Sequence, residues 1–523
     1  MRIEIYDTTL RDGAQQEGMN LSVADKLAIA RLLDQLGVHM VEGGWPGAVP
    51  RDTQFFQEAV GTQLFGRSVL AAFGATRKVG TTAEHDPQVR ALLDSGAPLV
   101  TLVAKSDIRH VERALRTEGD ENLDMVRDTI EFLTREGREV LLDAEHFFDG
   151  YRYDPAYTRS VVQVAADAGA RTVVLCDTNG GMRPNWVGEI VTDMGSIGVP
   201  LGMHAHNDTG CAVANTLAAV EAGARHIQGT INGYGERTGN ADLLTCVANL
   251  QLKLGYDCLG EDLLQAAPIA HQISEITNIS PFARQPYVGA SAFAHKAGLH
   301  ASAIRIDPDL YQHIEPKAVG NDMRMLVSDM AGRASIELKA RELGVNVSGR
   351  PDAVAAVTQK VKEAEALGYT YDAADASFEL LLREELDGHR TSYFEVESWR
   401  VITDSQSDGG ALSEATVKLT AGGKRVLRTG EGNGPVNALD HALRACLATA
   451  YTELEKFELI DFKVRILDAS HGTDAVTRVL IETSDGATTW TTVGVDANII
   501  EASWKALVDS ITYGLLRAGV EPR

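Results

Sequence analysis

Two histidines separated by a single residue are the sharpest chemical signal in the sequence. His204 and His206 come at the end of the apolar run PLGMHA, which is typical of a buried β-strand. Because residues two apart on a strand point to the same face, both imidazoles can reach one ion. Asp12, which follows another predicted strand, can complete a set of three ligands that leaves coordination positions open for substrate and water. The alternative is that both histidines are hydrogen-bonded to neighbouring loops without a metal.

Other side chains with catalytic potential accompany this set. Arg11 precedes Asp12, and a guanidinium beside a metal suits a ketone oxygen or an enolate that gains negative charge. The alternative is a salt bridge at the rim, and both interpretations hold if Glu236 orients Arg11. His300 has the side chain of a general base that works near neutral pH. Tyr311 is either a proton donor or an aromatic residue packed beneath its own segment.

A repeated strand–helix unit must position these side chains. Helix-like segments end at glycines that each lead into a short apolar run, and these glycines are Gly37, Gly66, Gly96, Gly137, Gly169, Gly198 and Gly223. Such glycines are expected as left-handed helix caps, and the apolar runs are typical of buried parallel strands. With the opening strand IEIYDT, the pattern predicts eight strands within residues 1–261 and therefore an α/β fold, the (β/α)8 TIM barrel. A doubly wound open sheet is the alternative, but no GxGxxG follows the first strand.

The rest of the chain divides into a helical part and a strand-rich part. Residues 262–375 are predicted to form a mostly helical accessory segment that completes the active site. Residues 376–523 contain a weak internal duplication, and each copy predicts a small β-β-α half of a C-terminal α+β domain. The loops before the two duplicated helices contain Gly434, Pro435 and Gly494, where an amino acid could bind backbone groups. The alternative is that these are ordinary loop residues.

Composition excludes several classes of partner. The chain has 523 residues with a formal net charge of −24, and 44% of them are hydrophobic. A folded protein with so acidic a surface repels nucleic acid and anionic lipid, so we expect neither as a partner. The five cysteines form no CxxC pair, which argues against a disulfide framework or a zinc cage. Because no signal-peptide pattern or membrane-length apolar stretch is visible, we expect a cytoplasmic protein.

Five motifs carry a resemblance to a known family. They occur in the order DTTLRDGAQQ, DTNGG, MHAHND, GYGERTGNADL and AHKAGLH, and they closely resemble the acyl-CoA-dependent 2-ketoacid condensing enzymes. This family comprises the 2-isopropylmalate, homocitrate and citramalate synthases. The resemblance implies a metal-dependent TIM barrel and a homodimer in which residues 376–523 form a regulatory domain. The segments DAEHFFDGY and HASAIRIDPDLYQHIEPKAVGNDMRMLVSDMAGRASI are most similar to one citramalate synthase branch.

The resemblance also implies roles for individual residues. It gives as ligands of Mg²⁺, Mn²⁺ or Zn²⁺ the residues Asp12, His204, His206 and Asn240. It makes Arg11 the catalytic arginine and Glu236 its orienting partner, and it places Gln15, Glu145 and Thr178 around the ketoacid, with Glu145 also catalytic. It makes His300 the base and Tyr311 a catalytic tyrosine.

The reaction implied by the resemblance is a Claisen-type condensation of acetyl-CoA with pyruvate. Hydrolysis of the thioester then gives (R)-citramalate and CoA, a step that feeds isoleucine biosynthesis, with isoleucine or another branched-chain amino acid as feedback effector. A preference for a larger ketoacid would instead indicate a 2-isopropylmalate or homocitrate synthase. More distant alternatives are a lyase or carboxyltransferase on the same barrel and a non-catalytic metabolite sensor. Selecting pyruvate needs bulk in the pocket, for which Phe73, Phe147 and Phe148 are candidates.

Overall fold

The computed structural model describes residues 1–405, 411–467 and 475–522. The chain packs as two compact units, of which the first comprises residues 1–293 and 314–322. The second contains residues 294–313 and the remainder from residue 323 onward. Among the helices in the described ranges, none combines the length and the apolar character needed to cross a bilayer.

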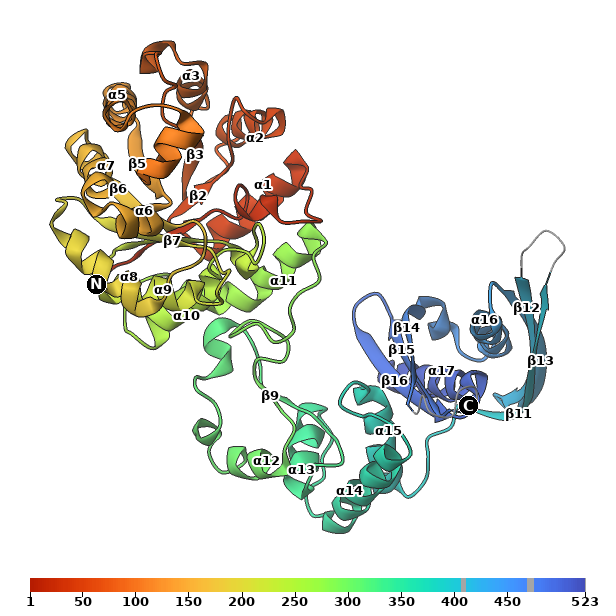
Figure 1. Cartoon of the computed structure of the whole chain (residues 1–523). Coiled ribbons are helices and arrows are strands. Elements are labelled where there is room, and N and C mark those ends of the chain that lie inside the picture. Colours follow the sequence, from red (N-terminus) through yellow and green to blue (C-terminus); the bar gives the residue numbers. More distant parts are fainter. Residues whose placement is uncertain (406–410, 468–474, 523) are drawn as a thin grey trace. The chain divides into compact units, whose positions relative to one another are not determined.

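The first unit is built on a closed ring of eight parallel strands that neighbour one another in chain order (Figure 1). Pairing between Ile5 of the first strand and Ile227 of the last closes the ring. The strands are β1 Glu4–Asp7, β2 Met40–Glu42, β3 Val69–Ala75, β4 Leu99–Lys105, β5 Glu139–Glu145, β6 Thr172–Asp177, β7 Leu201–Ala205 and β8 His226–Gly229. The predicted TIM barrel is therefore confirmed, and the open sheet is excluded.

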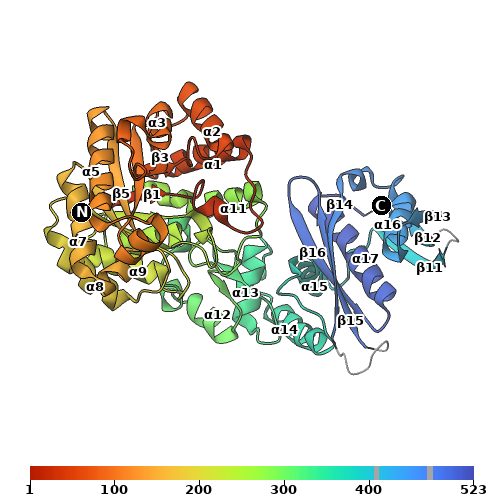
Figure 2. The same cartoon turned by 45° about the horizontal axis from the view of Figure 1, so that its top comes forward.

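Helices cover the outside of this barrel (Figures 1 and 2). They are α1 Val23–Leu36, α2 Pro50–Gly61, α3 Pro87–Asp94, α4 Ile108–His110, α5 Gly119–Arg135, α6 Phe147–Tyr153, α7 Pro155–Asp167, α8 Pro184–Asp193, α9 Ala212–Glu221, α10 Leu243–Leu252 and α11 Ala266–Thr277. In α1, Ser22 and Asp25 form a capping box that supplies partners for the first backbone N–H groups. Ile29 and Leu33, four residues apart on one face of α1, are fully buried in the core between helix layer and strands.

The predicted glycine caps are left-handed with one exception. Positive φ angles occur at Gly37, Gly96, Gly137, Gly169, Gly198 and Gly223. Gly66 is not such a cap, because α2 already ends at Gly61 and Gln63 carries the positive φ. The loop that follows is instead anchored by the carboxylate of Asp34, which accepts the backbone N–H of Gly66 at 3.1 Å.

The second unit begins with a mostly helical region, as predicted. A short parallel pair of strands, β9 Ala294–His295 and β10 Arg324–Met325, precedes most of its helices. The helices are α12 Gly298–Ile304, α13 Arg333–Glu342, α14 Pro351–Ala366 and α15 Asp375–Asp387. The fully buried ammonium of Lys339 lies 2.7 Å from carboxylate oxygens of Glu342 and Asp375, which ties α13 to α15.

The C-terminal part consists of two similar halves, each an antiparallel three-stranded sheet with one helix (Figure 2). The first half contains β11 Phe394–Ser405, β12 Ala411–Ala421, β13 Lys424–Gly432 and α16 Pro435–Leu447. The second contains β14 Glu458–Ile466, β15 Thr477–Ser484, β16 Thr489–Asp496 and α17 Ile499–Arg517. Each half thus has one strand more than the predicted β-β-α pattern, since β11 and β14 precede the duplicated segment.

Gly494 has a packing role in this duplicated domain. It lies within strand β16, not in the loop before the helix as predicted, and it is buried. A Cβ atom at Gly494 would lie 1.9 Å from the carbonyl oxygen of Ala502 in α17. Gly430 in the first half is equivalent, because a Cβ there would lie 2.4 Å from the backbone nitrogen of Ala442 in α16. A glycine is therefore required where each helix crosses its sheet.

Replacing Gly494 with alanine is expected to lower the free energy of unfolding by about 1–3 kcal/mol, because strand and helix must move apart. Thermal unfolding monitored by tryptophan fluorescence measures the loss. The matched control is Gly434→Ser, since Gly434 has an extended φ and a Cβ atom there would have no neighbour within 4 Å. A Gly494→Ala variant that melts with the parent would contradict the packing role.

Candidate active site

Three potential metal ligands converge at the carboxyl ends of the barrel strands. The Nε2 atoms of His204 and His206 lie 3.3 Å apart. The Oδ2 atom of Asp12 lies 3.3 Å from Nε2 of His204 and 3.7 Å from Nε2 of His206. All three side chains are buried. The predicted cluster therefore exists, with its donor atoms directed at one point.

Hydrogen bonds behind His204 fix which of its nitrogens faces this point. Its Nδ1 lies 2.9 Å from Oε1 of Gln228, and Nε2 of Gln228 donates to Oδ1 of Asp143 at 2.9 Å. Because an amide oxygen only accepts hydrogen bonds, Nδ1 of His204 carries a proton, and Nε2 is the nitrogen that faces Asp12 and His206. Such a bond behind a histidine ligand is the usual way that proteins orient it toward a metal.

The charges of the cluster also suit a cation. Burial alone would raise the pKa of Asp12, but the adjacent Arg11 and the interaction with His204 hold that pKa well below its usual range. Burial and the neighbouring His204 lower the pKa of His206 to about 4. At neutral pH the cluster therefore offers a carboxylate and an uncharged imidazole at His206, which are the forms that bind metals.

Asn240 supplies a further oxygen beside the cluster. Its backbone forms an isolated β-bridge with His206, its side chain is buried, and its Nδ2 donates to the carbonyl of Tyr234 at 3.1 Å. Its Oδ1 has no hydrogen-bond partner in the described part of the chain. A buried oxygen without a partner costs free energy that a cation or a water molecule would offset. Two imidazoles, a carboxylate and an amide oxygen fit Mg²⁺, Mn²⁺ or Zn²⁺.

Glu42, rather than Glu236, orients Arg11. The Nε of Arg11 donates to Oε2 of the fully buried Glu42 at 2.7 Å, and Tyr6 holds the other Glu42 oxygen at 2.7 Å. The ring of Phe73 lies 3.8 Å from the Arg11 guanidinium carbon. The predicted contact from Glu236 is not found, because its side chain is 55% exposed and has Arg237 as its charged neighbour at 3.9 Å. The signal for Glu42 was its place directly at the end of the second strand.

Most predicted site residues line one cavity of about 740 Å³ at this end of the barrel. Among its lining residues are Arg11, Asp12, Gln15, Glu145, Thr178, His204, His206 and Glu236. His300 and Tyr311 belong to the second unit, where their rings stack with centroids 4.0 Å apart.

One wall of the cavity is polar and is formed by the ends of β4, β5 and β6. The ammonium of Lys105 forms an ion pair with the carboxylate of Glu145. The backbone N–H of His146, which has a positive φ, donates to Oγ1 of Thr178 at 2.8 Å. This bond uses a lone pair of the Thr178 oxygen and not its hydroxyl hydrogen, which can still donate to a ligand.

The apolar wall of the cavity contains one of the three phenylalanines predicted to supply bulk there. Phe73 lines it and meets Trp45 edge to face at 5.3 Å between ring centroids. Val103, Leu115 and Met125 complete this wall. The predicted contribution of the two phenylalanines after strand β5 is wrong, because both are fully buried in the barrel core and neither lines the cavity; they are Phe147 and Phe148.

Comparison with known proteins decides the family. The chain is 62% identical over 520 residues to an (R)-citramalate synthase of Streptomyces coelicolor, covering 99% of this chain and 97% of that protein. It is 48% identical over 525 residues to an (R)-citramalate synthase of Synechocystis, covering 98% and 96%. The chain belongs to the (R)-citramalate synthase family. A relative of the same description from Aquifex aeolicus is 47% identical over 520 residues, covering 99% and 98%.

Three domain families match successive parts of this citramalate synthase family member. The HMGL-like family matches residues 2–278, which include the barrel and the metal-ligand cluster. The family described as homocitrate synthase post-HMGL domain-like matches residues 287–368. The LeuA allosteric (dimerisation) domain matches residues 372–515, which include both duplicated halves.

Removing the hydrogen bond behind His204 is expected to weaken metal binding. In a Gln228→Leu variant, Nδ1 of His204 loses its acceptor, and the cation affinity should fall by about 10- to 100-fold. Calorimetric titration of the chain with Mn²⁺ measures this. The control is Gln359→Leu on the exposed face of α14, which should bind as the parent does. Unchanged affinity in Gln228→Leu would contradict the proposed orientation of His204.

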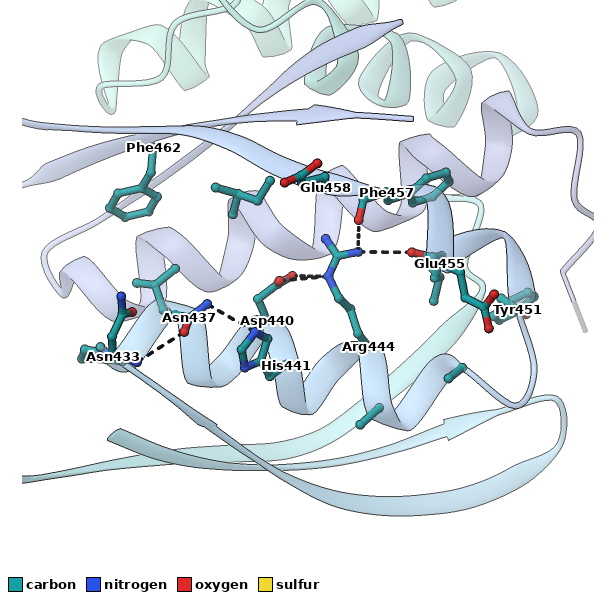
Figure 3. Close-up of a pocket in the computed structure, with 17 residues that line it drawn as sticks. Asn433, Asn437, Asp440, His441, Arg444, Tyr451, Glu455, Phe457, Glu458 and Phe462 are labelled. Carbon is teal, nitrogen blue, oxygen red and sulfur yellow. Dashed lines mark hydrogen bonds and ion pairs between the residues drawn. The ribbon is translucent and has the colours of Figure 1, made fainter. Parts of the chain in front are cut away.

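A second cavity, of about 840 Å³, lies in the second unit beside α16 (Figure 3). Arg444 lies between the carboxylate of Asp440 at 2.8 Å and the carbonyl oxygen of Phe457 at 2.6 Å. Of the predicted regulatory residues, Gly434 and Pro435 line this cavity at the start of α16, whereas Gly494 is not among its lining residues. Its apolar lining includes Val436, Leu459 and Phe462.

Proposed function

We propose that the chain condenses acetyl-CoA with pyruvate and hydrolyses the thioester to release (R)-citramalate and CoA. The observation that carries the proposal is the convergence of Asp12, His204 and His206 beside Arg11 in a member of this family. The product feeds isoleucine biosynthesis in this proposal. No lyase or carboxyltransferase activity is needed to account for the site.

Arg11 and Thr178 bind the ketoacid in this mechanism. A bound cation, held by Asp12, His204 and His206 with Asn240 as further ligand, would supply Lewis acidity for the ketone. The guanidinium of Arg11 is fixed by Glu42 and donates to the ketone oxygen as it becomes negative. The hydroxyl hydrogen of Thr178 donates to the ketoacid carboxylate, and Gln15 lines the same cavity.

His300 and Tyr311 serve as base and proton donor in this proposal. His300 removes a proton from the acetyl methyl group, and the resulting carbon nucleophile attacks the ketone. The centroids of the two rings lie 4.0 Å apart, Tyr311 is 39% exposed and His300 is half-buried, so neither side chain is closed off from solvent. Water then cleaves the thioester, with Glu145 as the cavity carboxylate suited to accept its proton.

The choice of ketoacid can be measured directly. Release of free thiol from acetyl-CoA is followed with pyruvate, 2-ketoisovalerate and 2-ketoglutarate as competing acceptors. We expect the largest kcat/KM with pyruvate, because Phe73 and Trp45 reduce the space beside Arg11. A preference for either larger acid would identify a sister activity of the same family. Absence of thiol release with every acceptor would favour a sensor without catalysis.

We also propose that the cavity beside α16 binds a branched-chain amino acid, isoleucine, as feedback effector. Asp440 and Glu458 are carboxylates at its wall that can accept hydrogen bonds from the ammonium group. Val436, Leu459 and Phe462 are suited to an aliphatic side chain. The match to an allosteric domain family supports this assignment.

We also propose that the chain forms a homodimer through its C-terminal domain. Strand β14 is at the edge of its sheet and alternates apolar side chains that are 37–57% exposed, namely Ile460, Phe462, Val464 and Ile466. An exposed apolar edge strand is a surface that proteins normally cover. A second copy of this chain is the proposed cover, in accord with the dimerisation domain family that matches here.

Isoleucine is expected to raise the melting temperature of the parent by several degrees. A ligand at about 100 times its Kd stabilises the folded state by ~2.7 kcal/mol. In a Val436→Trp variant the indole occupies the space beside Val436 that the aliphatic side chain of isoleucine would take, so the shift should disappear. Val426→Trp on β13 is the matched control, since Val426 is half-buried but does not line the cavity. Equal shifts in all three proteins would place the effector elsewhere.

A further inference from the structure

Lys105 is one of five positively charged side chains that line the catalytic cavity, with Arg11, Arg77, Lys78 and Arg237. It is the last residue of β4 and pairs in register with Glu145, the last residue of β5. Their side chains form an ion pair and are 26% and 25% exposed, so both remain accessible from the cavity that they line. The carbonyl of Lys105 accepts a hydrogen bond from Asn122 in α5 at 2.9 Å, which fixes the backbone at this point.

The arginines of the cavity are committed to other partners. Arg11 is held by Glu42, which does not line the cavity. Arg77 is paired with two carboxylates of α5, and Arg237 is paired with a carboxylate in the loop after β7. Lys105 makes its ion pair with Glu145, which also lines the cavity and is 25% exposed. A substrate oxygen can therefore approach this ammonium without breaking the structure that surrounds it.

The condensation needs two positive groups because two different oxygens become negative. The ketone oxygen does so when the carbon–carbon bond forms, and Arg11 beside Asp12 is placed for that oxygen. The thioester oxygen does so earlier, when the acetyl methyl group loses its proton. Donors that meet a developing charge in a partly buried site commonly contribute factors of about 10²–10³ in rate.

We propose that the Lys105 ammonium stabilises the enolate oxygen of acetyl-CoA, an inference that rests on the proposed condensation. The base takes the methyl proton, the C–H electron pair becomes the C=C bond, and the carbonyl π pair moves to the oxygen that faces Lys105. When the enolate carbon attacks the ketone, that electron pair returns and the thioester carbonyl forms again. The ketone π pair moves to its own oxygen near Arg11, so no further reactant is required.

Glu145 keeps this ammonium in place between turnovers. Its carboxylate holds Lys105 at the cavity wall, where a free lysine side chain would sample several rotamers. Both residues come from adjacent barrel strands, which are the most rigid elements available for a reacting group. Lys105 is accordingly a catalytic residue in this proposal.

The test separates enolate formation from condensation. Exchange of the acetyl-CoA methyl protons with D₂O is followed by NMR in the presence of Mn²⁺ and oxamate, an unreactive analogue of pyruvate. Turnover and the KM for the ketoacid are measured in parallel. The variants are Lys105→Met and Lys105→Arg. The matched control is Lys505→Met, which breaks the Lys505–Asp496 ion pair outside the barrel.

Lys105→Met should lower both exchange and kcat by about 100-fold or more, with the ketoacid KM and the Mn²⁺ affinity within twofold of the parent. Lys105→Arg should recover part of both rates, and Lys505→Met should match the parent. Parent-like exchange in Lys105→Met would overturn the proposal. Should Lys105→Met not fold, a Lys105→Arg variant with normal Mn²⁺ affinity and fully parental exchange would overturn it equally. If the parent prefers a larger ketoacid, only the proposed function is contradicted, and the role of Lys105 is not. The reason is that proton exchange measures enolate formation, which comes before the reaction with any ketoacid.

Discussion

A His204→Ala variant is expected to lose about 10³-fold or more in kcat/KM with acetyl-CoA and pyruvate. Nε2 of His204 lies 3.3 Å from both Asp12 and His206, so the substitution removes one of the three metal ligands. A Lewis acid at this point is worth several kcal/mol of transition-state stabilisation, and each 1.36 kcal/mol corresponds to a factor of ten. Thiol release measures the loss at saturating Mn²⁺.

The same variant should also lose its calorimetric response to Mn²⁺, which separates loss of the cation from loss of the fold. His389→Ala is the control, because His389 is exposed beyond the end of α15. A His204→Ala variant that keeps full turnover would exclude this cluster as the metal site.

An Arg11→Lys variant should lose about 10²–10³-fold in kcat while its Mn²⁺ affinity stays close to that of the parent. Arg11 uses Nε to bind Glu42 and stacks against Phe73, which leaves other guanidinium hydrogens for the substrate. Lysine has a single nitrogen and cannot both keep the bond to Glu42 and reach the ketone oxygen. Because lysine keeps the positive charge, this variant tests the hydrogen-bond geometry of the guanidinium separately from its charge.

The initial rate of thiol release at saturating pyruvate measures this loss of kcat. Arg425→Lys is the matched control, since Arg425 makes three hydrogen bonds to Glu397 on the exposed surface of the C-terminal domain. A loss confined to KM, with kcat unchanged, would contradict the assignment of Arg11 to the transition state.

The barrel could be predicted because each of its strands is marked by residues that are close together in the sequence. Gly37 and the similar caps end one helix and begin the next strand within a few residues, so the pattern depends on neighbours in the sequence. The pair of histidines was visible for the same reason, because a strand fixes the direction of His204 relative to His206 without reference to the rest of the fold.

Contacts between neighbouring strands were harder to predict. The partner of Arg11 is Glu42, which reaches it because β1 and β2 pair with Asp7 opposite Val41. The sequence places Glu236 in a polar, glycine-rich loop near the same rim, but nothing local distinguishes it from Glu42 as a partner. The ion pair between Lys105 and Glu145 depends on strand register in the same way.

The C-terminal domain was incompletely predicted for a related reason. Strand β14 alternates as a strand should, but the apolar side chains of its sequence ELIDFKVRI are largely exposed within one chain. An alternating pattern whose apolar side chains do not pack into the core of their own chain predicts the position of a strand only weakly. Gly494 was placed in a loop because a glycine usually marks one, whereas here it permits close contact between β16 and α17.

The dependence of citramalate formation on a divalent cation tests the central claim most directly. The chain is freed of metal by a chelator, and thiol release from acetyl-CoA with pyruvate is measured before and after addition of Mg²⁺, Mn²⁺ or Zn²⁺. We predict turnover below about one-thousandth of the restored rate without a cation, and recovery in the parent but not in His204→Ala. Full turnover in the metal-free chain, or none with pyruvate under any of the three cations, would contradict the account.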